Sequence, residues 1–190
     1  MKTRESGMPP EEAWEGFFNP GLTLEKLGLT KNCRGVLDFG CGYGTFAVVA
    51  AKTIDGTVYA LDIEPEMVAA TNAKAAAADL HNVQASCRDF VAHGSGLADG
   101  SMNYVMLFNI LHAEERMTLL KEAWRVLSAG GRLAVIHWNY DPNTPRGPQM
   151  SIRPRPEQCR AWAEAVGFVM LPPGVIDLPP HHYGFVFERN

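Results

Sequence analysis

The sequence predicts an α/β fold built on a doubly wound, mainly parallel sheet of seven strands, with the last strand antiparallel. Apolar, β-branched segments alternate along the chain with segments of helical periodicity. The strand-like segments are also apolar almost without interruption, which is typical of strands covered by helices on both faces. A length of 190 residues suits one domain with a sizeable core.

The first half of the chain supplies three strands and two helices. The predicted strands are 33–40, 57–63 and the weaker 82–89, and the predicted helices are 46–54 and 65–80. Pro65 opens the second helix, and Glu64 and Glu66 lie at its positive end.

The second half continues the alternation and then breaks it. Segment 102–111 is a long apolar strand, segment 114–127 an amphipathic helix, and segment 132–138 a fifth strand. We expect the glycines of 129–131 to end that helix. Beyond 139, a loop rich in Pro and Gly leads to a helix at about 156–166 and to strands near 168–171 and 184–188.

Composition narrows the classes of partner and compartment. A net charge of -4 gives no basic excess for nucleic acid or an anionic membrane, so we expect neither partner. Four separated cysteines form no CxxC pair, which disfavours a disulfide framework or a zinc site. No apolar run approaches the roughly 18 residues needed to span a bilayer, and the N-terminus has no signal-peptide core. We therefore expect a cytoplasmic protein, either a monomer or a homodimer.

The stretch "VLDFGCGYGTF" at 36–46 places glycines at alternate positions where the first strand becomes a helix. Glycines there allow a tight turn and a close approach of a ligand, at the sheet edge where doubly wound folds bind ligands. Thr45 occupies the position where a dinucleotide-binding G-x-G-x-x-G would need glycine, and no GK[ST] of a P-loop occurs. The pattern is D-x-G-x-G-x-G.

This motif resembles the first motif of the class I S-adenosylmethionine-dependent methyltransferases of type 11/25. Four further segments match that family in order: "VYALDIEPEMV", "CRDF", "SMNYVMLFNILH" and "EAWRVLSAGGRLAVIHW". The resemblance covers about residues 34–138 and implies a Rossmann-like methyltransferase fold. Asn103 departs from the pattern, since family members commonly have Asp there.

The resemblance implies S-adenosylmethionine as cofactor and S-adenosylhomocysteine as product. Asp38 suits the ammonium group, the Gly40–Gly44 turn the methionine portion, and Asp62 the ribose diol. The expected cofactor-binding residues are Asp38, Gly40, Cys41, Gly42, Gly44, Asp62, Ile63, Asp89, Phe90, Asn109 and Ile110. Each acid also has a structural alternative, because Asp38, Asp62 and Asp89 can cap the turn or helix that follows.

The acceptor side is less specified, because methyl transfer needs alignment but not always a base. His112 is the candidate catalytic residue, as a base or an orienting group, or else it bonds to the start of the next helix. The candidate substrate residues are Trp14, Phe18, His137, Trp138, His182 and Tyr183, each of which can instead be a packing residue. Arg146, Arg153 and Arg155 either meet an anionic substrate or lie in a solvated loop, and no metal site is expected.

We therefore expect one methyltransferase domain over 1–190, acting on a small molecule. Its parts are an N-terminal lid or helical segment at 1–30, a cofactor-binding core at 34–138 and a substrate side at 139–190. The alternative is a regulatory protein that binds S-adenosylmethionine or S-adenosylhomocysteine without turnover.

Overall fold

Short apolar runs form the strands at the centre of the molecule. The computed structural model describes residues 9–190. Its strands are β1 (Gly35–Phe39), β2 (Thr57–Asp62), β3 (Val83–Cys87), β4 (Met102–Phe108), β5 (Leu127–Trp138), β6 (Val169–Met170), β7 (Ile176–Leu178) and β8 (His182–Glu188). All five residues of β1 are buried, as expected for a strand with both faces covered.

Two helices precede β1 in the described part of the chain, and the others lie in connections between the strands. They are α1 (Glu11–Glu15), α2 (Pro20–Lys26), α3 (Thr45–Thr53), α4 (Pro65–Ala77), α5 (Phe90–His93), α6 (Arg116–Val126) and α7 (Pro156–Val166). Pro65 occupies the first turn of α4, as the sequence predicts.

The sheet confirms the expected doubly wound fold. Its order is β3-β2-β1-β4-β5-β8-β6, so the direction of winding switches between β1 and β4. β1 to β5 pair in parallel, and β8 runs antiparallel to β5. The expected number of seven strands is wrong, because the three-residue β7 also pairs with β8 and makes eight.

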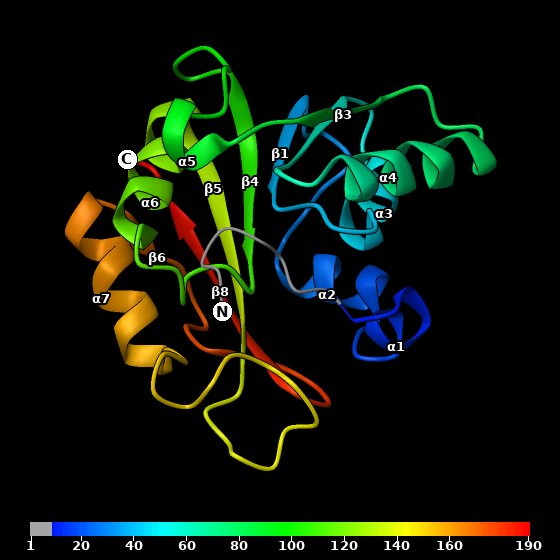
Figure 1. Cartoon of the computed structure of the whole chain (residues 1–190). Helices are drawn as coiled ribbons and strands as arrows, with labels where there is room; N and C mark the ends of the chain where they lie inside the picture. The colour runs from blue at the N-terminus through cyan, green and yellow to red at the C-terminus, as the bar shows by residue number, and fades with distance from the viewer. Residues whose placement is uncertain (1–8) are drawn as a thin grey trace.

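Helices cover both faces of the sheet (Figure 1). α6 and α7 pack on one face around Leu119, Leu120 and Ala163, all buried. α2 and α3 pack on the other, around Leu24 and Phe46. Two apolar layers back to back thus support the strand ends from which the functional residues project.

The prediction that glycines end the 114–127 helix is wrong. α6 ends at Val126, and the next residue, Leu127, is already extended and pairs with Met102 in the sheet. Gly130 has a φ of 72°, and a Cβ on Gly131 would lie 2.8 Å from the carbonyl of Ser128. The glycines therefore lie within β5, where the pairing of β4 with β5 shifts register, and not at the end of the helix.

Asn103 replaces the expected Asp without loss of its contacts. Its side-chain oxygen accepts hydrogen bonds from the backbone N–H groups of Arg34 (2.9 Å) and Gly35 (3.2 Å). Neither bond needs a negative charge, so the amide anchors the start of β1 as a carboxylate would.

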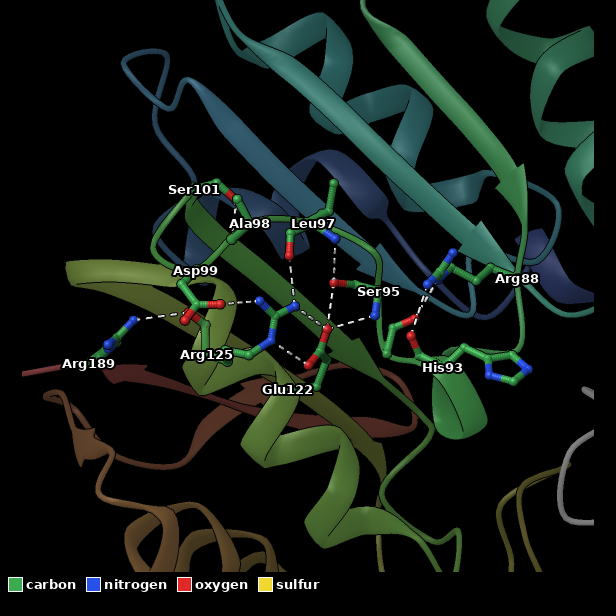
Figure 2. A network of polar contacts seen from close by, with 11 residues as sticks. Arg88, His93, Ser95, Leu97, Ala98, Asp99, Ser101, Glu122, Arg125 and Arg189 are labelled. Atoms are coloured by element: carbon green, nitrogen blue, oxygen red, sulfur yellow. Dashed lines mark hydrogen bonds and ion pairs between the residues drawn. The ribbon is translucent and has the colours of Figure 1, made fainter.

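A polar network ties the loop between α5 and β4 to α6 (Figure 2). Glu122 accepts two hydrogen bonds from Ser95, each 2.6 Å long, and two from Arg125. Arg125 also pairs with Asp99 and donates to the carbonyl of Leu97 at 2.8 Å. The Arg125 guanidinium beside it lowers the pKa of Glu122 to about 2.

Candidate functional site

The glycine turn after β1 has the backbone geometry that only glycine adopts readily. Gly40, Gly42 and Gly44 all have positive φ, at 74°, 54° and 76°. A Cβ on Gly44 would lie 2.9 Å from the Thr71 hydroxyl, so the turn presses directly against α4. The N–H groups of Gly40 and Cys41 both donate to the carbonyl of Leu61. The turn is therefore held across the end of β2.

Asp62 completes this attachment. One carboxylate oxygen accepts from the N–H of Gly42 at 2.9 Å, and the other from the N–H of Glu64 at 3.0 Å. Burial raises its pKa, while these backbone bonds oppose the rise. A carboxylate has about four lone-pair sites, so two remain for a ligand hydroxyl.

Asp38, the second-last residue of β1, is buried, with 3% of its surface exposed. Burial raises its pKa to about 7, and the nearby charge of Asp62 adds to the rise. An ionised Asp38 is therefore disfavoured until a cation lies beside it. This is the behaviour expected of a group that receives a ligand ammonium.

Cys41 is a packed thiol. Its sulfur lies 3.5 Å from the Thr71 hydroxyl, and burial raises its pKa above the usual range. A thiol held in its protonated form is a poor nucleophile.

The residues expected beside the adenine occupy the ends of β2 and β3. Ile63 follows β2, and its carbonyl lies 3.4 Å from the sulfur of Cys87. Asp89 accepts from the N–H of Ala92 at 2.9 Å as the cap of α5, and Phe90 packs on Phe39 at 5.1 Å between ring centroids. The structural alternative for Asp89 is thus seen, and its contact with adenine stays a prediction.

Asn109 and Ile110 follow β4 on the other side of the switch point. Asn109 has a φ of 57°, which is uncommon for a residue other than glycine. Its N–H donates to the carbonyl of Ile136, while both polar atoms of its side chain are buried and unpartnered within residues 9–190. Ile110 lies against Gly40, 3.4 Å from where a Cβ would stand. Ile110 therefore packs against the glycine turn, while Asn109 bonds to the end of β5 through its backbone.

Four of the six candidate substrate residues meet in one ring cluster, composed of Trp14, Phe17, Phe18, Trp138 and His182. The ring of His182 lies 4.4 Å from Phe18 and 4.2 Å from Trp138, centroid to centroid. The ring of Trp14 lies 4.9 Å from that of Phe18 in a tilted arrangement, and Phe17 meets Trp138 edge to face at 5.2 Å, centroid to centroid. The N-terminal segment thereby lies over the ends of β5 and β8, with its rings in mutual contact.

His137 and Tyr183 point to the opposite face. They are paired across β5 and β8, one residue from the pair formed by Trp138 and His182, and strand side chains alternate. The Tyr183 hydroxyl donates to the carbonyl of Pro154 at 3.0 Å. His137 instead lies 5.6 Å from His112, centroid to centroid. The structure thus separates the acceptor-side candidates into two groups.

Lys74 attaches the N-terminal segment to α4. Its ammonium lies 2.5 Å from a carboxylate oxygen of Glu11 and 2.5 Å from one of Glu15. A cleft of about 270 Å³ opens beside it; its lining is Glu15, Pro20, Gly44, Thr45, Val48, Val49 and Lys74. Nothing in the sequence alone pairs Lys74 with α1, because the partners are about 60 residues apart. The first eight residues of the expected 1–30 segment lie outside the described residues.

Arg153 organises the loop at 139–155 from within. It is 7% exposed and donates to the carbonyls of Asn139, Asp141, Arg146 and Pro148 and to the hydroxyl of Thr144. Arg155 instead lies over the ring of Tyr140, 3.8 Å from its centroid. Arg153 was expected either to bind an anionic substrate or to lie in a solvated loop. The structure shows a third role, in which its buried guanidinium holds the loop together.

The described residues contain neither a metal-binding cluster nor a membrane-spanning helix. Among residues 9–190, no group of three or more His, Cys, Asp or Glu side chains is arranged to hold a metal ion. Within the same residues, no helix has the length and apolar character required to cross a membrane.

Comparison with known proteins defines the family. Residues 36–131 match the family model described as a methyltransferase domain, and the chain belongs to this family. The match begins in β1 and spans the glycine turn, Asp62 and Asn109.

Individual relatives agree with the family. The demethylmenaquinone methyltransferase of Listeria monocytogenes is 33% identical over 127 residues, 63% of this chain and 51% of that protein. The chain thus spans about half the length of the curated relatives it matches.

Solved structures confirm the fold. A SAM-dependent methyltransferase from Aquifex aeolicus superposes with a TM-score of 0.82 at 23% identity, covering 95% of this chain and 94% of that one. The [4+2]-cyclase SpnF shares the fold with a TM-score of 0.68 at 24% identity, covering 88% of this chain and 61% of that one.

Proposed function

We propose that this chain is an S-adenosylmethionine-dependent methyltransferase (EC 2.1.1.-) that transfers a methyl group to a small molecule. The observation that carries the proposal is a buried carboxylate, suited to pair with a cation, next to a turn with glycine at alternate positions. Asp38 is the carboxylate, with a pKa of about 7, and Gly40–Gly44 is the turn. Membership of the methyltransferase-domain family supports the same conclusion.

The chain's own residues would bind and orient the cofactor, which supplies an electrophilic methyl group when bound. Asp38 pairs with the ammonium, and Asp62 uses its two remaining lone-pair sites for the ribose diol. Ile63, Asp89 and Phe90 line the adenine, while Gly40, Cys41, Gly42, Gly44, Asn109 and Ile110 surround the rest. Asp62 has a second task, since the same carboxylate also holds the turn to Gly42.

The N-terminal segment and the 139–155 loop would cover the acceptor. Trp14 and Phe18 close over Trp138 and His182, with Lys74 fastening α1 to α4. This cover would close one side of the acceptor site, at the carboxyl end of β5, and exclude water from that side. On the opposite face, His112 orients the acceptor or removes its proton, with His137 and Tyr183 beside it. All parts of 1–190 then act as one methyltransferase domain in the cytoplasm, with neither nucleic acid nor membrane as partner.

Fold alone does not decide the reaction, since a protein named as a cyclase shares it. None of the comparisons favours the alternative of a regulatory protein without turnover.

Turnover tests the proposal directly. The purified protein is incubated with S-adenosylmethionine and a small-molecule metabolite extract, and S-adenosylhomocysteine is quantified by mass spectrometry. We expect product that depends on the extract and that is lost in Gly42→Val, whose side chain would enter the turn at a positive φ. Tight cofactor binding with no product across broad extracts would contradict the proposal and leave a binding protein.

A further inference from the structure

Buried polar atoms without partners gather at the ends of β4 and β5. Within residues 9–190, both ring nitrogens of His137, Nδ1 of His112 and both amide atoms of Asn109 are buried without a hydrogen bond. His137 is 0% exposed, and its ring lies close to the backbone of Trp138. Leaving a buried polar group unpaired destabilises the folded protein, so such groups point to a ligand that supplies the missing hydrogen bonds.

The three side chains belong to one place. The rings of His112 and His137 are 5.6 Å apart, centroid to centroid, and meet edge to face at 81°. Asn109 donates its N–H to Ile136, the residue before His137, and its backbone also interacts with the ring of His112. Its positive φ is a strained backbone conformation of the kind that recurs at binding sites.

Both imidazoles are uncharged at neutral pH. Burial lowers the pKa of His112 and lowers the pKa of His137 much further. The nearby charges act in the same direction, with Arg116 on His112 and Arg153 on His137. A neutral imidazole has one N–H donor and one nitrogen acceptor, so each ring can both give and take a hydrogen bond.

The surrounding charges disfavour an ionic ligand. The positive field of Arg116 and Arg153 opposes a cation, and Glu115, the acid on the same turn, has an interaction partner of its own. The arginines are themselves engaged and poorly placed to receive an anion. Arg116 donates to the carbonyl of Leu111 and lies over Trp162, while Arg153 is bonded throughout the 139–155 loop.

We propose that His112, His137 and Asn109 form a polar subsite that hydrogen-bonds the hydroxyl group of an uncharged acceptor. A hydroxyl has one donor and two acceptor lone pairs, which matches a pair of neutral imidazoles and an amide. This inference rests on the proposed function and narrows it, since the acceptor is an alcohol, phenol or enol and not an amine cation or a carboxylate. His137 acts as a positioning residue for that hydroxyl.

Nitrogen-15 NMR of the labelled full chain, saturated with S-adenosylhomocysteine, tests the subsite with two probes of similar size. Phenol presents an uncharged hydroxyl, and benzylammonium a cation. We expect phenol to shift the imidazole nitrogens of His112 and His137, and benzylammonium to leave them unchanged. His137→Phe, which keeps a ring but no polar atom, should weaken phenol binding roughly 3- to 10-fold, the equivalent of one lost hydrogen bond.

The matched control is His81→Phe. His81 is exposed and lies between α4 and β3, away from the subsite, so this variant should bind phenol as the wild type does. If His137→Phe does not fold, His112→Phe is titrated in its place with the same expectation. Unchanged imidazole signals with phenol, or equal or larger shifts with benzylammonium, would overturn the inference. Calorimetry on the same protein separates the two proposals. If S-adenosylhomocysteine does not bind, the cofactor site is refuted. If it binds but phenol causes no response, only the hydroxyl subsite is refuted.

Discussion

At the scale of single residues, Asp38 is an acid whose charge is governed by its burial. Its pKa of about 7 in the folded protein exceeds the unfolded value of 3.8. The folded state therefore holds a proton that the unfolded chain releases. The resulting contribution to stability is present at low pH and is lost as the pH rises toward 7.

The same shift predicts how cofactor binding depends on pH. A ligand ammonium favours the ionised carboxylate, so affinity for S-adenosylhomocysteine should fall by up to about tenfold per unit as the pH drops below 7. Calorimetry between pH 5.5 and 8 measures this slope. Asp38→Asn cannot ionise and should bind weakly with a flatter slope; equal slopes in the two proteins would refute the assignment.

Asp62 carries a separate prediction, because its carboxylate holds the turn at Gly42 and Glu64. Asp62→Ala should weaken S-adenosylhomocysteine binding by on the order of 1–3 kcal/mol, since it leaves buried donors unpaired and removes the ribose acceptor. Asp55→Ala is the control, as Asp55 is half exposed and pairs only loosely with Lys31 at 3.7 Å. An unaltered affinity in Asp62→Ala would show that this acid plays no part in binding.

At the scale of elements, the 139–155 loop depends on Arg153. Arg153→Ala removes five hydrogen bonds from a buried guanidinium and should lower the free energy of unfolding by roughly 2–4 kcal/mol. Trypsin should then cleave after Arg146, the one arginine of this loop that is not followed by proline. Urea denaturation and timed proteolysis measure the two effects.

Arg160→Ala is the matched control for this loop variant. Its exposed pair with Glu164 within α7 contributes little, so both stability and cleavage rate should stay near the wild type. A loop as resistant in Arg153→Ala as in the control would show that Pro and Gly content, not the arginine, sets its structure.

The network around Glu122 predicts an acid-sensitive brace between α6 and the loop before β4 (Figure 2). Its pKa falls from 4.5 to about 2 on folding, so its contribution is present above about pH 4.5 and is lost as the pH falls toward 2. Glu122→Gln should lower the free energy of unfolding at pH 7 by about 1–3 kcal/mol, with a smaller difference at pH 3. Urea titrations at both pH values measure it, and a constant difference would contradict the linkage.

At the scale of the whole molecule, the sequence indicates the central sheet well. The apolar runs of β1, β2, β4 and β5 are visible in the sequence, and local signals such as Pro65 at the start of α4 and the glycines after β1 mark their connections. The positions of Asp38, Asp62 and Asn109 follow from those strands, because functional groups in such sheets lie at strand ends.

Features that depend on contacts between distant parts of the chain could not be predicted from the sequence pattern. β7 is three residues long and pairs with β8. The glycines at 129–131 lie in β5 because the strand already begins at Leu127, which pairs with Met102. Likewise, the division between Trp138 with His182 and His137 with Tyr183 depends on the β5–β8 register. No local propensity encodes that register.

The central claim is that the buried carboxyl of Asp38 and the glycine-rich turn at Gly40–Gly44 bind a cofactor that carries an ammonium group. Titration of the wild-type protein with S-adenosylhomocysteine at pH 8, followed by calorimetry, tests it most directly. We predict saturable binding with one ligand per chain. A folded sample that gives no binding heat at millimolar ligand would contradict the claim and every catalytic role assigned above.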